Sequence, residues 1–145
     1  MIFEKADIKD IDELLKIEKK SFVSHWNKQT FFEEFTSENG HYLVAKIDGK
    51  IVGYSGFRHV LDEGHITTLA VHPKYRKKGI GTQIIAKLIE DAKAKNLKKL
   101  FLEVRQSNLP AQKIYKSLGF KVIDRRREYY QHPLEDALVM QNENL

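Results

Sequence analysis

The stretch from residue 70 to residue 95, "AVHPKYRKKGIGTQIIAKLIEDAKAK", limits most strongly what this chain can fold into. An apolar strand ends at Pro73, Gly79 and Gly81 precede an amphipathic helix, and the basic side chains between them are Lys74, Arg76, Lys77 and Lys78. A helix start leaves backbone N–H groups unpaired and carries a partial positive charge. Because glycine lets a ligand approach that backbone closely, the stretch predicts an anion-binding loop between a strand and a helix.

The spacing Arg76-x-x-Gly79-x-Gly81 differs from two common phosphate-binding loops. A Walker A loop needs Gly-Lys-Ser or Gly-Lys-Thr after four spacers, and the dinucleotide fingerprint needs a third glycine where this chain has Ile84. From these residues alone, the alternative is a basic loop that precedes a surface helix and binds nothing.

The remaining hydrophobic periodicity predicts one mixed α/β domain over residues 1–145, in which only the middle alternates strand and helix. Asp10 and Asn27 are expected to cap the first two helices, and Asp48-Gly49 to form a hairpin turn. Pro110 fits the first turn of the last helix, and Gly119 its end. The predicted strands are 1–6, 41–47, 50–61, 65–71, 98–104, 120–130 and 136–140, with 98–104 buried on both faces; the predicted helices are 10–22, 27–35, 82–96 and 109–120.

Composition narrows the function classes. The chain has no cysteine, which excludes disulfides, thiolate metal sites and a cysteine nucleophile. No apolar run approaches the ~18 residues that span a bilayer, and the acidic start does not resemble a signal peptide, so a cytoplasmic protein without a membrane partner is expected. The net charge of +5 suits an anionic partner, although a solvated lysine-rich surface explains it equally well. The six histidines lack metal-ligand spacing, so no metal site is predicted.

Four motifs occur in a familiar order: the basic loop after "LAV", the segment "LEVRQSNLPAQKIYKSLGF", then "REYY" and "EDALVM". Together they resemble the GNAT acetyltransferases, in particular the N-α-acetyltransferases of the RimI and Ard1 branch. "IEKKSFVSHWN" resembles that branch's first helix and loop, with His25-Trp26-Asn27 where RimI-type proteins have Pro-Trp-Ser, and "KIVGY" resembles its third strand. "IEKKSF" is closer to RimI, whereas "GHITTLAVHPKYRKKGIG" is closer to Ard1.

This resemblance implies a GNAT fold with acetyl-CoA as cosubstrate. The expected sheet is mixed but mostly antiparallel, splayed between its fourth and fifth strands and flanked by about four helices. The loop would hold the diphosphate, while a strand end and Asn108 would hold the pantetheine arm; Asn108 could also cap a helix. The residues implied to bind the cofactor are Leu69, Ala70, Val71, Arg76, Lys77, Lys78, Gly79, Ile80, Gly81, Thr82 and Asn108.

Two residues are candidates for proton transfer. Glu103 lies in an apolar strand, where a carboxylate must be paired, hydrated or raised in pKa; burial is expected to raise its pKa. An ion pair with Arg105, on the same strand face, or with another base is the structural alternative, whereas the resemblance implies a general base. Tyr115 has the spacing of a core aromatic, but the resemblance implies that it protonates the coenzyme A thiolate.

The expected activity is acetylation of the α-amine of a protein or peptide by direct attack in a ternary complex. Tyr129 and Tyr130 are neighbours on a strand, so one is expected to pack inward while the other lines the substrate groove. The RimI-like segments imply a ribosomal protein with N-terminal Ala or a similar small residue, and the Ard1-like segment implies a broader set. The alternatives are a GNAT acting on lysine or small amines and a basic nucleic-acid-binding module, although the basic residues do not alternate with aromatics as a stacking surface requires.

Overall fold

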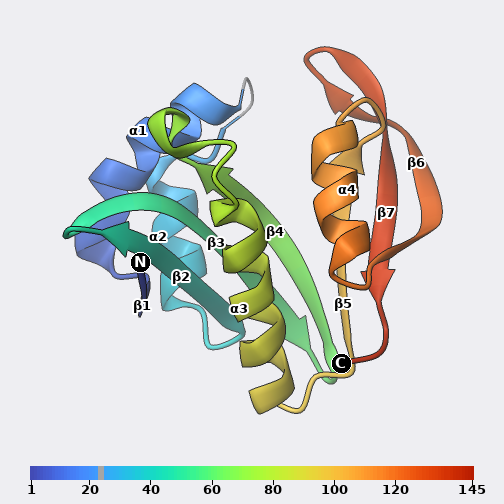
Figure 1. The fold of residues 1–145 in the computed structure, drawn as a ribbon, viewed down its shortest axis with the longest axis horizontal. Coiled ribbons are helices and arrows are strands. Elements are labelled where there is room, and N and C mark those ends of the chain that lie inside the picture. Colours follow the sequence, from blue (N-terminus) through green and yellow to red (C-terminus); the bar gives the residue numbers. More distant parts are fainter. Residues whose placement is uncertain (23–24) are drawn as a thin grey trace.

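The computed structural model describes residues 1–22 and 25–145, in which seven strands form one sheet (Figure 1). Residues 23 and 24, inside the segment "IEKKSFVSHWN", lie outside the described residues. The strands are β1 Ile2–Lys5, β2 Gly40–Ile47, β3 Lys50–Val60, β4 Glu63–Val71, β5 Lys99–Arg105, β6 Lys121–Gln131 and β7 Leu134–Asn142. The helices are α1 Ile11–Ser21, α2 Lys28–Thr36, α3 Ile80–Ala94 and α4 Leu109–Ser117, with the 3-10 turns η1 Ile8–Asp10 and η2 Pro73–Tyr75.

The strand order is β1-β2-β3-β4-β5-β7-β6, and every neighbouring pair is antiparallel except β4 and β5. These two parallel strands pair at three positions only, ending at His65 opposite Phe101. Since β4 continues to Val71 and β5 to Arg105, the strands separate beyond that point, and the opening widens toward their carboxyl ends (Figure 1). The predicted splayed mixed sheet with four helices is confirmed.

The helices cover the sheet unequally. Helices α3 and α4 lie on one face, whereas α1 and α2 lie on the other face over β2 to β4 (Figure 1). One apolar core packs under α3 and α4, including Ile84, Leu88 and Leu102, and a second packs under α1 and α2 around Phe31. The α1/α2 side of β5 carries Lys99, Phe101, Glu103 and Arg105.

Several local predictions are confirmed. Asp48 and Gly49 have φ angles of 51° and 78°, the positive values that a two-residue hairpin turn needs. Asn27 accepts a hydrogen bond from the Thr30 N–H and caps α2. Gly119 follows the last residues of α4 with a φ of 94°.

Two local predictions are wrong. Asp10 stands at the start of α1 but makes no capping bond there, because its carboxylate accepts from the Asp7 N–H and completes a capping box around the preceding 3-10 turn. Strand β5 is buried on one face only, because no helix covers the side that carries Phe101, Glu103 and Arg105. Because Phe101 is apolar, the sequence does not show that buried and partly exposed positions alternate along this strand.

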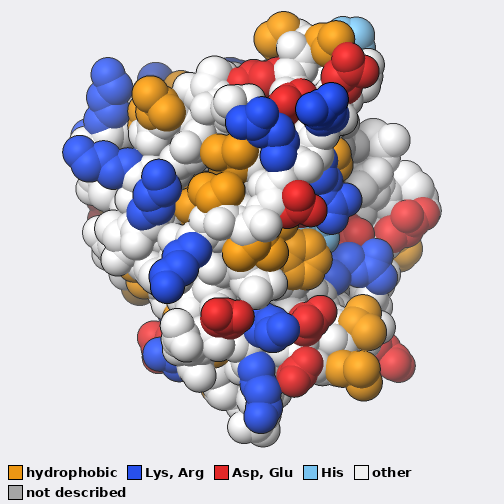
Figure 2. Space-filling model, turned by 90° about the vertical axis from the view of Figure 1, so that its right-hand side faces the viewer, with side chains coloured by type: hydrophobic (Ala, Val, Ile, Leu, Met, Phe, Trp, Pro, Cys, Tyr) orange, Lys and Arg blue, Asp and Glu red, His pale blue; other side chains and the backbone are white. Residues whose placement is uncertain are grey.

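Strand β6 ends the sheet, and nearly all of its side chains are exposed. Figure 2 views the molecule from this side and shows acidic side chains among the Lys and Arg side chains over the centre and right of the face, whereas the upper left carries basic side chains without acidic ones. Over most of this face, the basic side chains do not form the continuous stripe that nucleic-acid-binding proteins present. Among the described residues, no helix is long and apolar enough to cross a membrane.

Candidate active site

The start of α3 has the geometry of an anion cradle. Its first hydrogen bond runs from the Gln83 N–H to the Gly79 carbonyl at 3.1 Å. The N–H groups of Ile80, Gly81 and Thr82 precede that bond and are not used by the helix. Gly79 has a φ of 79°, and a Cβ added to it would meet no heavy atom within 4 Å. The backbone here is thus open to a ligand, and the positive end of the helix dipole favours an anion.

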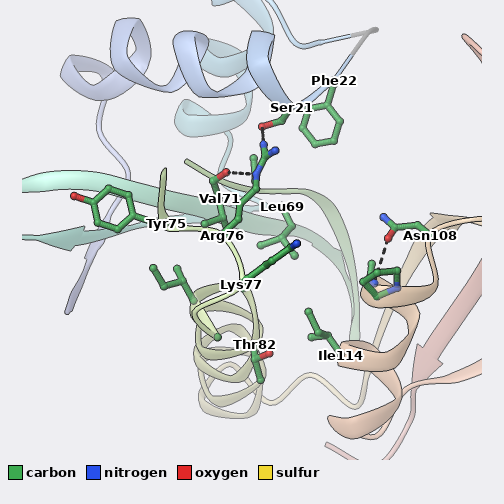
Figure 3. A pocket seen from close by; sticks show the side chains of 16 residues that line it. Ser21, Phe22, Leu69, Val71, Tyr75, Arg76, Lys77, Thr82, Asn108 and Ile114 are labelled. Atoms are coloured by element: carbon green, nitrogen blue, oxygen red, sulfur yellow. Dashed lines mark hydrogen bonds between the residues drawn. The ribbon is translucent and has the colours of Figure 1, made fainter. Parts of the chain in front are cut away.

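This cradle forms one wall of a pocket of about 380 Å³ between the ends of α1 and β4 and the first turns of α3 and α4 (Figure 3). All the predicted cofactor-binding residues except Lys78 line it. The Lys78 ammonium instead lies 5.6 Å from the centre of the Tyr75 ring. The lining residues that the sequence did not indicate are Ser21, Phe22, Tyr75, Pro110, Ala111 and Ile114.

The opposite wall is the first turn of α4. The Asn108 side-chain oxygen accepts from the Ala111 N–H at 3.2 Å, so the predicted capping role is confirmed. Gln112 is buried, and its amide donates to the carbonyls of Arg105 and Gln106. These bonds fix the turn between β5 and α4. The donors, cations and apolar walls of the pocket fit a ligand with a diphosphate and a flexible, partly apolar arm.

Glu103 lies outside this pocket, on the α1/α2 side of β5. One carboxylate oxygen, Oε1, accepts from His65 Nε2 at 2.8 Å and from the Tyr129 hydroxyl at 3.1 Å. The other oxygen, Oε2, is buried and has no partner in the described part of the chain. The side chain is 8% exposed. A buried ionised oxygen without a donor is costly, and this oxygen is closed to solvent, so a ligand's N–H group could reach it only after the surrounding side chains move.

The predicted rise in the pKa of Glu103 is wrong. Burial does act to raise it, but the hydrogen bond and charge of His65, the Tyr129 hydrogen bond and the charge of Arg126 together hold the pKa below its ordinary value. Arg105 is not the partner in the alternative pairing, since its guanidinium binds Glu135 at 3.2 Å. The other form of that alternative, a pair with another base, is present, because His65 lies 2.8 Å from the Glu103 carboxylate. The sequence shows the burial of Glu103 but not the donors that reach it from β4 and β6.

His65 is the partner of Glu103 that the sequence did not indicate. It occupies the last paired position of β4 before the opening, and its ring stacks on Phe101 with centroids 4.5 Å apart. An ionised carboxylate only accepts, so the ring nitrogen facing Glu103 must carry the proton. The sequence predicts a strand at 65–71, but it does not predict which residue of β5 lies opposite His65.

Tyr115 belongs to the core under α4, where its ring lies 5.9 Å from that of Phe120. It is 7% exposed, and burial together with the charge of Tyr130 raises its pKa, so the hydroxyl stays protonated. Tyr115 does not line the pocket, whereas its neighbour Ile114 does. The core packing expected from the pattern is therefore present.

The expected inward and outward division of Tyr129 and Tyr130 is wrong. Both are at least partly exposed, and both contact polar side chains of β5: Tyr129 bonds Glu103, while Arg105 lies 4.2 Å from the centre of the Tyr130 ring. The reason is an irregularity in the register between Arg126 and Tyr130, which interrupts the alternation of the strand. The described residues contain no group of three or more His, Cys, Asp or Glu placed to hold a metal ion.

Comparisons with known proteins agree with this geometry. The profile of the acetyltransferase (GNAT) family matches residues 11–120. A Bacillus subtilis protein, provisionally named ribosomal protein bS18-alanine N-acetyltransferase, is 40% identical over 92% of this chain and 89% of its own. An N-alpha-acetyltransferase of Sulfurisphaera tokodaii is 33% identical over 93% and 88% of the two chains.

Among solved structures, the ribosomal-protein-S18-alanine N-acetyltransferase of Escherichia coli superposes with a TM-score of 0.92 at 28% identity. The superposition covers 99% of this chain and 94% of that one. The likeness therefore extends over the whole sheet, including the opening between β4 and β5. This chain belongs to the GNAT family of acetyltransferases.

Proposed function

We propose that this protein transfers the acetyl group of acetyl-CoA to the α-amine of a protein or peptide N-terminus. One observation carries the proposal: an opening in the sheet separates an anion-binding pocket on one face from a buried carboxylate oxygen without a donor on the other. A donor substrate and an acceptor amine could thus approach the same gap from opposite sides. The named relatives, two of which are N-terminal acetyltransferases, support this choice of acceptor.

Acetyl-CoA would supply an acetyl group activated as a thioester. The N–H groups of Ile80, Gly81 and Thr82 would donate to its diphosphate, with Arg76 and Lys77 adding charge. The backbone of residues 69–71 and the first turn of α4 would hold the pantetheine arm. These assignments follow from the lining of the pocket and from the family.

Glu103 is assigned as the group that receives the amine proton. Its lowered pKa makes it fully ionised near neutral pH, but it also makes it a weaker base than a carboxylate with a raised pKa. A free α-amine has a pKa of ~7.7–8.0, so roughly a tenth is already neutral at pH 7. The most suitable role for the Glu103 carboxylate is to take the proton of that amine as the new N–C bond makes the nitrogen acidic.

Tyr115 is assigned as the proton donor to the departing thiolate. Its raised pKa keeps the proton on the hydroxyl at any working pH, which a donor requires. It stands beside Ile114, whose side chain lines the pocket. The assignment comes from the family, and the pKa direction is consistent with it.

The acceptor class is proposed from the relatives as a protein N-terminus, and a ribosomal protein with N-terminal alanine is the narrower proposal. Such a substrate would place the reaction in the cytoplasm. A lysine side chain, with a pKa of ~10.4, is neutral in well under a thousandth of molecules at pH 7. A carboxylate of lowered pKa is poorly suited to deprotonate it, which favours the α-amine.

Mass spectrometry of peptides incubated with acetyl-CoA tests this proposal. The mixture should contain lysine-bearing peptides in matched pairs, one with a free and one with a blocked N-terminus, and one pair should begin with alanine. Acetylation is expected on the α-amine of the free peptides only. Comparable labelling of lysines in the blocked peptides would reassign the enzyme to the lysine class.

A further inference from the structure

The last residue of α1, Ser21, bonds to a side chain of the loop before α3. The Arg76 Nη2 group donates to the Ser21 Oγ at 3.0 Å, and the Arg76 Nε–H donates to the Val71 carbonyl at 3.0 Å (Figure 3). These bonds join the ends of α1 and β4, and all three residues line the pocket. The contact crosses 55 positions of sequence, so no local pattern indicated it.

The two bonds fix the orientation of a planar group. A guanidinium has five N–H donors in a rigid fork, and the Nε–Nη2 edge of Arg76 is the one that these bonds occupy. Holding one edge of a rigid plane also fixes the direction of its remaining donors. Those remaining donors, on Nη1 and Nη2, are the ones that could bind phosphate oxygens.

Ser21 is well suited to be the fixed partner. Its hydroxyl proton is donated to the Ile17 carbonyl at 2.7 Å, so its oxygen is oriented to accept from Arg76. One turn earlier, the buried Glu18 accepts hydrogen bonds from the Tyr54 hydroxyl and from the Trp26 N–H. The end of α1 is thus held by the core beneath it, and it offers Arg76 a rigid support.

We propose that Ser21 is a positioning residue of the cofactor site, which holds the Arg76 guanidinium ready for the diphosphate. The inference rests on the proposed binding of acetyl-CoA to this loop and adds α1 to the elements that build the site. Arg76 is exposed, and an exposed arginine without partners would have to be ordered when the ligand binds. Ordering one such side chain in advance is worth roughly 2- to 10-fold in affinity.

A double-mutant cycle tests this role. The variants are Ser21→Ala, Ser21→Thr, Arg76→Ala and the double variant Ser21→Ala with Arg76→Ala. A matched control is Thr36→Ala, since Thr36 at the end of α2 also donates to the carbonyl four residues earlier, at 2.8 Å, but lies outside the pocket. Two probes are titrated, coenzyme A by calorimetry and S-acetylpantetheine, which lacks the diphosphate, by NMR.

The expected result is specific to the diphosphate. Ser21→Ala should weaken coenzyme A binding roughly 2- to 10-fold, leave S-acetylpantetheine binding unchanged and add nothing in the Arg76→Ala background. Ser21→Thr, which keeps the hydroxyl, and Thr36→Ala should both bind coenzyme A like the wild type. A merely structural role for Ser21 would weaken both probes, with or without Arg76.

Failure of the inference differs from failure of the proposed function. If the wild type binds no coenzyme A, the cofactor site itself is misassigned. If the wild type binds it and Arg76→Ala weakens binding, but Ser21→Ala does not, the positioning role alone is overturned. Equal weakening by Ser21→Ala in both Arg76 backgrounds would overturn it as well.

Discussion

Replacing Gly79 with alanine should weaken acetyl-CoA binding and should destabilise the fold only modestly. Gly79 has a φ of 79°, and an added Cβ meets no heavy atom within 4 Å. The cost within the protein is therefore only that of a left-handed backbone, about 1–2 kcal/mol for a residue with a Cβ. In a chain of this size such a loss lowers Tm by roughly 3–8 °C.

Binding of the cofactor carries a separate cost. Gly79 lines the pocket, and in the proposed site its new Cβ would stand where the diphosphate meets the N–H groups at the start of α3. A hydrogen bond to a charged group is worth about 1.5–3 kcal/mol. Losing one such bond should raise KM for acetyl-CoA roughly 10- to 150-fold, with KM for the peptide nearly unchanged.

Gly49 offers a matched control in the β2–β3 hairpin. Its φ is 78°, and an added Cβ likewise meets nothing within 4 Å, but it does not line the pocket. Gly49→Ala should thus lower Tm by the same amount and leave both KM values alone. Circular dichroism melts and initial rates at varied acetyl-CoA supply the comparison. If the two variants raise KM for acetyl-CoA equally, or if Gly79→Ala raises both KM values together, the cradle is misassigned.

Three further substitutions probe the proton-transfer groups. Glu103→Gln should lower kcat by roughly 10²–10⁴ without changing KM for acetyl-CoA. The neutral fraction of the amine rises with pH for the variant as for the wild type, so the defect should persist from pH 6 to pH 9, and a wild-type kcat across that range would place the base elsewhere. Tyr115→Phe should also lower kcat across this range, and a wild-type kcat would argue against a proton donor. His65→Phe keeps a ring against Phe101 and removes the donor to Glu103, so the pKa of Glu103 should rise, and activity should fall first at the acid end. Carbon-13 NMR titration of the Glu103 carboxyl measures this directly, and an unchanged pKa would show that His65 does not stabilise the carboxylate.

The order of elements could be predicted from the sequence because local patterns determine it. Asp48-Gly49 forms its turn through positive φ angles that few other residue pairs adopt. Asn27 caps α2 by accepting a hydrogen bond from a residue only three positions away. The anion-binding geometry of the loop before α3 could be predicted for the same reason, since Gly79 and the helix start are adjacent in sequence. Asp10 shows where local patterns fail. Its carboxylate could bond either to the 3-10 turn before it or to the start of α1, and it bonds to the 3-10 turn.

The partners within the site could not be predicted because they come from distant segments. His65 and Glu103 are 38 positions apart, and they meet only because β4 and β5 are parallel up to His65. The bond between Ser21 and Arg76 likewise depends on how α1 packs on the sheet. Burial alone predicted a raised pKa for Glu103, whereas the donors that the fold brings to it reverse the sign.

We expect acetyl-CoA and the acceptor to occupy opposite faces of the sheet opening at the same time and to react directly. Initial rates measured at varied concentrations of both substrates test it most directly. Since the chain has no cysteine to form a thioester, the account predicts a ternary complex, intersecting lines in double-reciprocal plots, and no mass added to the enzyme by acetyl-CoA alone. Parallel lines, or an enzyme that gains one acetyl group before the peptide is added, would contradict it.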